Sequence, residues 1–252
     1  MKSTAVFKKT ACIILLSFLG RKATAQSQFP KYEFGIMGGS FIYQGDLSPS
    51  TLGTYQHLKP AIQLFASKLL DESFALRANI SRGRIEGNDA WYAGPAWRRV
   101  RNFSFNTSIT ELSANLVWNF YSYQQEGSVK KLSMYVFGGA GFSLLHVQRD
   151  WSHLNIAVYG TESSFLKGLA ADTMHTPPTI IPVLPFGAGM RYQISSELSI
   201  AAEVTYRITF TDYLDGFSKS ANPNMNDYYY GYSVGLVYSP EKNLLRCPKI
   251  VQ

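Results

Sequence analysis

Three aspartates lie in a polar loop near the C-terminal end of the sequence, between two segments that alternate polar and apolar residues. They are Asp212, Asp215 and Asp227. Carboxylate oxygens are the ligands that a hard cation prefers, but the spacing of these residues matches no calcium-binding loop. Asp is also a frequent turn former, because its carboxylate accepts hydrogen bonds from nearby backbone N–H groups, and Gly216 tolerates a positive φ. The pattern favours a structural turn, with a cation or partner site as the alternative.

The residue types that support catalysis are few and scattered. The four histidines, His57, His146, His153 and His175, fall in expected loops or at strand ends. The sequence contains no HExxH, GxSxG or CxxC motif and no phosphate-cradling glycine loop. Ser143 with His146 would supply a nucleophile and a base near a barrel mouth, as in lipid-modifying barrels, but such pairs also occur by chance. We therefore expect no enzyme activity, no cofactor and no metal centre.

Six charged residues share one property: each stands on the polar side of an alternating segment. They are Glu33, Arg77, Glu111, Arg191, Glu203 and Arg207. In a narrow barrel interior, three acids and three bases must pair, because an unpaired buried charge is very costly. We predict a network of ion pairs that fills the interior as a polar plug. A gated pore or a proton path is the alternative use of the same residues.

Strands are the elements that must position these side chains. In the segment LSIAAEVTYRITF, apolar residues fall on one face, while Glu203 and Arg207 fall on the other. Eight such segments lie near 32–43, 59–69, 73–86, 103–121, 133–147, 183–195, 198–210 and 228–239. Each is about as long as a tilted transmembrane strand, which needs roughly 9–11 residues. The fourth segment changes phase near Thr107 to Ile109, which predicts a β-bulge there.

The connections between these segments alternate in length. Short turns follow the second, fourth and sixth segments, and the long connections cover 44–58, 87–102, 148–182 and 211–227. This alternation is typical of outer-membrane barrels. We predict an all-β fold, an eight-stranded antiparallel transmembrane β-barrel with short periplasmic turns and long extracellular loops.

A soluble, secreted barrel is the alternative to this fold, and the two differ in the environment that the apolar face meets. In the membrane barrel, the face with Tyr206, Phe210, Tyr230, Tyr232 and Tyr238 meets lipid and headgroups. In a secreted, lipocalin-like barrel, the apolar face points inward. Charged residues make up only 16% of the chain, against roughly 25% in soluble domains, which favours the membrane barrel.

The first 25 residues match a secretory signal peptide, with a basic start, the apolar run ACIILLSFLG and the small residues ATA. We therefore divide the chain into a signal peptide (1–25), an outer-membrane barrel (26–240) and a periplasmic tail (241–252). Without the five basic residues of the leader, the formal net charge falls from +7 to +2. We expect outer-membrane lipids as partners and no nucleic acid. Only Cys247 follows the leader, so no internal disulfide is expected.

The densest basic run is WRRVR, from Trp97 to Arg101. The run predicts a solvated loop. Contact with anionic lipid headgroups at the membrane edge is the alternative.

Two stretches of the sequence, YEFGIMGGSFIYQGDLSP and YRITFTDYLDGFS, resemble a family of Bacteroidota outer-membrane barrels that includes PorG of the type IX secretion system. The most specific parts are YQGDL and TDYLD, which contain Tyr43, Gly45, Asp46, Thr211, Asp212, Tyr213 and Asp215. The resemblance implies a barrel that associates with the periplasmic ring of that protein-transport machine, including its lipoprotein subunit.

Two classes of function remain open at this point. One is a non-enzymatic barrel that anchors or contacts a periplasmic assembly. The other is a small-solute channel or a lipid-acting outer-membrane enzyme. A filled interior favours the first class, and a continuous open lumen favours the second.

Overall fold

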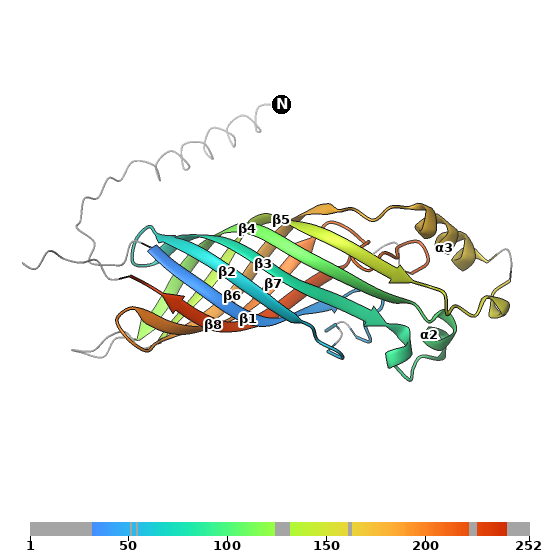
Figure 1. The fold of residues 1–252 in the computed structure, drawn as a ribbon, viewed down its shortest axis with the longest axis horizontal. Coiled ribbons are helices and arrows are strands. Elements are labelled where there is room, and N and C mark those ends of the chain that lie inside the picture. Colours follow the sequence, from blue (N-terminus) through green and yellow to red (C-terminus); the bar gives the residue numbers. More distant parts are fainter. Residues whose placement is uncertain are drawn as a thin grey trace, which may run out of the picture.

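The computed structural model describes residues 32–50, 52–53, 55–123, 132–160, 163–221 and 226–240. Eight strands pair in sequence order, and the last strand pairs with the first, so that the sheet closes into an antiparallel barrel (Figure 1). The strands are β1 (Tyr32–Gln44), β2 (Pro60–Leu69), β3 (Phe74–Asn88), β4 (Ser104–Tyr123), β5 (Leu132–Asp150), β6 (Ile180–Gln193), β7 (Leu198–Thr209) and β8 (Tyr228–Tyr238). The predicted eight-stranded antiparallel fold is confirmed. The expected signal peptide, the tail with Cys247 and most of the β4–β5 turn lie outside the described residues.

The connections at the two ends of the barrel differ in length, as predicted. At what we call the turn end, Asp71 Oδ1 accepts hydrogen bonds from the backbone N–H groups of Ser73 and Phe74, at 2.7 Å each. The opposite end, the loop end, carries the short helices η1 (Asp89–Trp91), α2 (Ala96–Arg101), η2 (Ile156–Val158) and α3 (Ser164–Met174). Figure 1 shows α2 and α3 beyond the same end of the barrel. Among the described residues, no helix is long and apolar enough to cross a bilayer.

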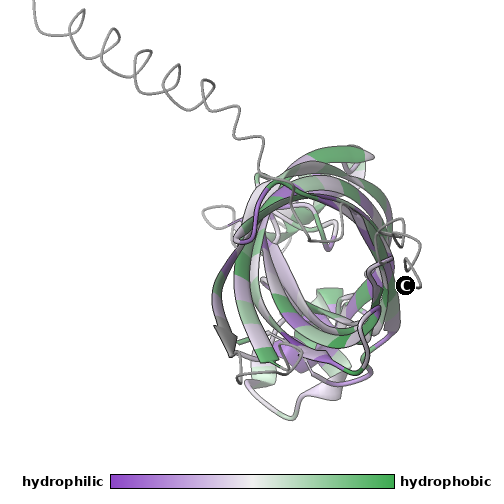
Figure 2. Ribbon diagram, turned by 90° about the vertical axis from the view of Figure 1, so that its left-hand side faces the viewer, coloured by the Kyte–Doolittle hydropathy of each residue, from purple (hydrophilic) through white to green (hydrophobic). Residues whose placement is uncertain are grey.

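The outer face of the barrel is apolar from the turn end to a boundary below the loop end. On β3 the outward side chains are apolar up to Ile80, and the next one is Arg82. On β4 the same change falls between Leu112, which is 63% exposed, and Thr110. Figure 2 shows apolar and polar residues alternating along the strands. Because the apolar side chains of this band point outward, the lipocalin-like alternative is wrong.

Aromatic side chains mark both edges of the apolar face. Tyr206 and Tyr230 stack on the outer wall, with 6.3 Å between ring centroids. Phe210, Tyr232 and Tyr238 are exposed on the outside, as expected for the face that meets lipid and headgroups.

β4 contains no bulge at residues 107–109, so that prediction is wrong. The strand pairs with β3 without interruption over residues 104–118, and its odd-numbered residues point inward throughout that span. The hydropathy pattern changes there because the interior changes: Phe105 meets an apolar cluster, whereas Glu111 meets charged groups. The pairing of β4 with β5 shifts instead at residues 119–121.

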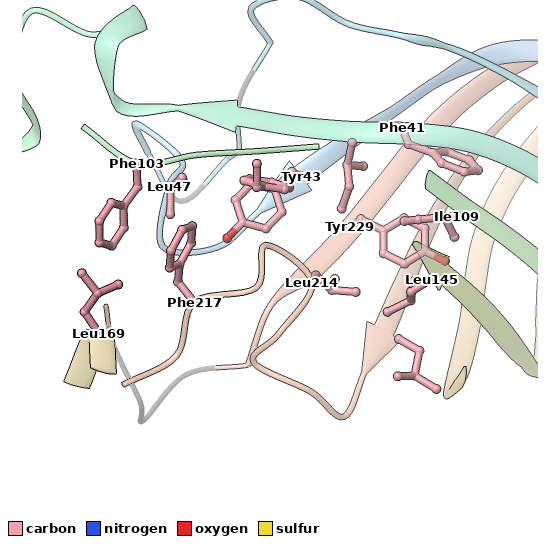
Figure 3. Close-up of a cluster of buried hydrophobic side chains, with 13 residues drawn as sticks. Phe41, Tyr43, Leu47, Phe103, Ile109, Leu145, Leu169, Leu214, Phe217 and Tyr229 are labelled. Atoms are coloured by element: carbon pink, nitrogen blue, oxygen red, sulfur yellow. The ribbon is translucent and has the colours of Figure 1, made fainter. Parts of the chain in front are cut away.

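Side chains fill the interior at the loop end. Thirteen buried residues form one apolar cluster there, and Leu214 and Phe217 reach it from the last long loop (Figure 3). The Phe217 ring stacks on Phe103, with 4.3 Å between centroids. We call this cluster the loop-end plug.

Two smaller apolar clusters lie inside the barrel. One surrounds Phe65, and the other contains Tyr135 and Phe137. Glycine makes room for these inward-facing rings. A Cβ on Gly189 would lie 2.5 Å from the ring of Tyr135, so a larger residue at that position would collide with it.

Candidate functional site

All six charged residues predicted for the interior point inward, and they form three ion pairs. Arg77 Nη1 lies 2.5 Å from Glu203 Oε1. Arg207 Nε lies 2.6 Å from Glu111 Oε2, and Arg191 Nη1 lies 2.6 Å from Glu33 Oε1. The pairs connect β3 with β7, β7 with β4, and β6 with β1. They therefore cross the barrel between strands that are not neighbours.

Neighbouring side chains satisfy the buried carboxylates further. The hydroxyl of Tyr135 donates to Glu203 Oε1 at 2.7 Å, and the hydroxyl of Tyr229 donates to Glu111 Oε2 at 3.0 Å. The Arg77 guanidinium also lies over the Phe65 ring, 4.1 Å from its centroid. Paired charges with several further partners are what a dry interior tolerates. Ion pairs and aromatic rings thus form a layer across the middle of the barrel.

Tyr43 connects the stretches YQGDL and TDYLD. Its hydroxyl lies 2.7 Å from Asp215 Oδ2 and 2.8 Å from Asp227 Oδ1. We call these three residues the Tyr43 hub. Gly45 packs directly against it, since a Cβ there would lie 1.9 Å from Asp227 Oδ1. Motif YQGDL therefore contacts motif TDYLD at the loop end.

The hub holds more protons than its groups ordinarily carry at neutral pH. A phenol has one proton, so Tyr43 donates to only one carboxylate at a time, and the other contact requires a protonated carboxyl group. Burial raises the pKa of Asp215 to about 8. Burial, together with the charge of Asp215, raises the pKa of Asp227 well above its ordinary value.

The remaining motif residues shape the loop around the hub. Thr211 Oγ1 accepts a hydrogen bond from the backbone N–H of Tyr213 at 3.2 Å. Asp212 is half-buried, and burial raises its pKa to about 6. Gly216 has φ +84°, so the positive φ expected at this glycine is present. The Asp46 backbone carbonyl accepts from Arg101 Nη2 at 3.4 Å.

The sequence did not predict a second carboxylate that organises the last loop, Asp172 on α3. Its oxygens accept hydrogen bonds from the backbone N–H groups of Ser218, Lys219 and Ser220, at 3.2, 3.0 and 2.8 Å. They also accept from the hydroxyl of Ser220 at 2.7 Å. Because helix and loop lie more than forty residues apart in sequence, only the folded structure reveals the contact.

Two arginines of the run WRRVR are buried inside the protein. For these two, both the predicted solvated loop and the alternative contact with lipid headgroups are wrong. Arg98 and Arg101 are buried against Asp89, with N–O distances of 3.1 and 2.6 Å. Arg98 Nη1 also donates to the Leu47 carbonyl at 3.1 Å, which connects this helix to the first long loop. The two arginines are three residues apart, which places them on one face of a helix. This spacing was the feature of the sequence that could have indicated a shared partner. Arg99 is exposed.

The Ser143–His146 pair does not form. Ser143 is buried in the interior and hydrogen-bonds with the Tyr229 hydroxyl at 3.0 Å, whereas His146 points outward on the same strand. In the part of the chain that the structure describes, no group of three or more His, Cys, Asp or Glu residues is arranged to hold a metal ion.

Comparisons with known proteins add a family and a set of similar folds. No curated protein matches the sequence. Similar solved structures include Ail, the attachment invasion locus protein of Yersinia pestis, at 10% identity and a TM-score of 0.41, over 82% of this chain and 98% of that one. The outer membrane protein OprG from Pseudomonas aeruginosa has 10% identity and a TM-score of 0.45, over 83% and 96%. The outer membrane enzyme PagL has 10% identity and a TM-score of 0.35, over 81% and 97%.

A family model matches nearly the whole described barrel, over residues 8–239. It is described as a domain of unknown function, DUF6089. The chain is therefore a member of the DUF6089 family with the fold of an eight-stranded outer-membrane barrel.

Proposed function

We propose that the protein is a non-enzymatic outer-membrane barrel that serves as a sealed scaffold and anchors or contacts a periplasmic assembly. The filled interior carries this proposal. Two buried ion pairs and one partly buried pair, that of Arg191 with Glu33, cross the barrel, and the loop-end plug lies on one side of them. A conducting pore needs a continuous aqueous path, and charged side chains locked to one another do not line such a path.

The outward apolar band supports a location in the outer membrane. On β4, about ten residues from Phe120 to Glu111 span the apolar part, close to the roughly 9–11 residues of a transmembrane strand. The seven residues from Thr110 to Ser104 continue beyond it. The barrel wall therefore projects from the membrane on the loop side, which we assign to the cell exterior.

The proposed partner is a periplasmic ring such as that of the type IX secretion system, including its lipoprotein subunit. The resemblance of YQGDL and TDYLD to the PorG-containing family supports this choice. Both motifs are used at the loop end, where their hub residues are buried. The surface available to a periplasmic partner is therefore the turn end, where Glu72 is exposed and Glu197 is partly exposed.

Affinity purification after mild detergent extraction tests the partner. We expect a periplasmic ring lipoprotein to co-purify with the tagged barrel. The double variant Glu72→Lys, Glu197→Lys should lose it, because the charge of the turn end is reversed. Lys219→Glu, an exposed change at the loop end, is the matched control and should retain it. Recovery of no periplasmic protein, or loss in the loop-end control alone, would contradict the proposal.

A further inference from the structure

The outer wall formed by β3, β4 and β5 changes character in three steps toward the loop end. The first step is apolar. Ile80 pairs with Leu112 across β3 and β4, and Leu112 pairs with Phe142 across β4 and β5. All three side chains point outward and are about half exposed or more. They form the last row that is apolar on all three strands, in position to contact acyl chains; in the next row only Leu144 of β5 is apolar.

The second step is basic. Arg82 and Arg84 follow Ile80 on the outer face of β3 and are exposed, and neither forms an ion pair with another described residue. Their register partners on β4 are Thr110 and Ser108, which offer hydroxyl groups at the same levels. Outward residues two apart on a strand are separated by roughly 7 Å. The wall thus presents two guanidinium groups and two hydroxyls, a set of donors suited to phosphate oxygens.

The third step is a hollow of about 320 Å³ on the same wall, above the arginines. It is lined by Trp91 of η1 and by polar side chains of all three strands, including Asn106, Gln148 and Asp150. Its volume falls at the low end of the roughly 300–1,000 Å³ of ligand pockets. An aromatic face beside amides and a carboxylate suits a sugar ring, whose C–H face packs on the aromatic ring while its hydroxyls hydrogen-bond to the polar groups.

The hollow is unsuited to a second phosphate. Glu86 also lines it, and its carboxylate is paired with Lys59 at 3.1 Å. Asp150 adds a second carboxylate, and Arg149, which also lines the hollow, already donates to the backbone carbonyls of Gly216 and His175 at 2.6 and 2.9 Å. Phosphate and sugar are therefore recognised at separate heights along one wall.

We propose that this wall binds one phosphorylated glycolipid of the outer leaflet. Its acyl chains lie on the apolar row, its phosphate lies at Arg82 and Arg84, and its sugar occupies the hollow beside Trp91. An ordinary phospholipid satisfies the first two steps and leaves the hollow empty. The inference rests on the proposed membrane location, with the loop end outside.

Native mass spectrometry of the detergent-solubilised full-length barrel tests the inference. The probes are a phosphorylated glucosamine-disaccharide lipid (lipid A), its dephosphorylated form, phosphatidylglycerol, and inorganic phosphate as a competitor. We expect the wild-type barrel to retain lipid A in preference to the other two lipids, with no displacement by inorganic phosphate. Arg82→Gln with Arg84→Gln should lower lipid A occupancy at least about tenfold, because it removes both guanidinium groups and one charge-assisted hydrogen bond alone is worth about that factor. Trp91→Ala should lower the occupancy of lipid A and leave the occupancy of phosphatidylglycerol unchanged.

Lys68→Gln, an exposed outward change near the turn end, is the matched control and should bind as the wild type does. All four substituted positions lie outside the interior, and a heat-modifiable gel band verifies that each variant has folded. Equal retention of lipid A and phosphatidylglycerol, an unaltered double-arginine variant, or displacement by inorganic phosphate would overturn the inference while leaving the membrane location intact. Retention of no lipid of any class would overturn both.

Discussion

At the residue scale, the interior ion pairs determine which single substitutions the barrel tolerates. Arg207→Ala removes the partner of Glu111 and leaves a buried carboxylate with only hydroxyl donors, from Tyr229 and Ser113. Breaking a buried pair from one side costs about 3–5 kcal/mol. We therefore predict that the heat-modified gel band of Arg207→Ala appears at a clearly lower temperature than that of the wild type.

Two controls separate lost pairing from general damage. Replacing both partners, Arg207→Met with Glu111→Leu, removes the charges together and should restore much of the stability, because apolar residues of similar volume often replace a buried pair without loss. Lys68→Ala, exposed on β2, should leave the transition temperature unchanged. An unaltered transition temperature in Arg207→Ala would mean that the interior is hydrated and that the ion pairs do not fill it.

At the element scale, the last long loop depends on proton binding at the Tyr43 hub. Burial raises the pKa of Asp215 from 3.8 to about 8. Between these values the ordered loop binds more protons than a loop open to solvent, so the free energy favouring the ordered loop decreases as the pH rises. The backbone N–H of Phe217, which donates to Asp215 Oδ1 at 2.8 Å, reports this order.

We predict that hydrogen-exchange protection at Phe217, corrected for the intrinsic rate, is lower at about pH 9 than at about pH 6. Asp215→Asn removes the titrating group and should flatten the pH dependence. The backbone N–H of Leu154, bonded to the Trp151 carbonyl outside the hub, serves as an internal control. The same slope in the variant and the wild type would show that the hub does not titrate in this range.

The contact between α3 and the same loop gives a separate prediction. Asp172→Ala removes the acceptor for three backbone N–H groups and for the hydroxyls of Ser220 and Tyr213, and even one hydrogen bond to a charged group is worth about 1.5–3 kcal/mol. Trypsin should cleave after Lys219 in intact cells at least about tenfold faster in this variant. Thr173→Ala, exposed on the same helix, should behave as the wild type does. Equal cleavage would show that Asp172 does not hold the loop.

These elements show where prediction from the sequence succeeded and where it stopped. Alternation located all eight strands because successive side chains point to opposite sides of the barrel wall, which is a local property. It misplaced a bulge in β4, because the interior itself turns from charged at Glu111 to apolar at Phe105. The partners of Asp172 were not predicted, because they arise where α3 and the last long loop fold together. Those of Asp89 lie within the same loop, where the hydropathy pattern does not show how the chain turns back on itself.

At the scale of the whole molecule, the orientation of the barrel is open to direct labelling. We predict that a membrane-impermeant maleimide labels Lys219→Cys in intact cells and Glu72→Cys only after permeabilisation, both in a Cys247→Ser background. Both positions are exposed, at the loop end and the turn end respectively. Ser220 is a poor site, because its side chain is buried against Asp172. The reverse labelling pattern would show that the turn end, and not the loop end, lies outside the cell.

The central claim is that the barrel crosses the outer membrane with a sealed interior. Ion current through a planar bilayer containing the purified full-length barrel tests it most directly, with the heat-modifiable band of the same sample confirming a folded protein. Because ion pairs and the loop-end plug fill the lumen, we predict no stepwise current above that of a protein-free bilayer. A steady single-channel current carried by the wild-type protein would contradict the account.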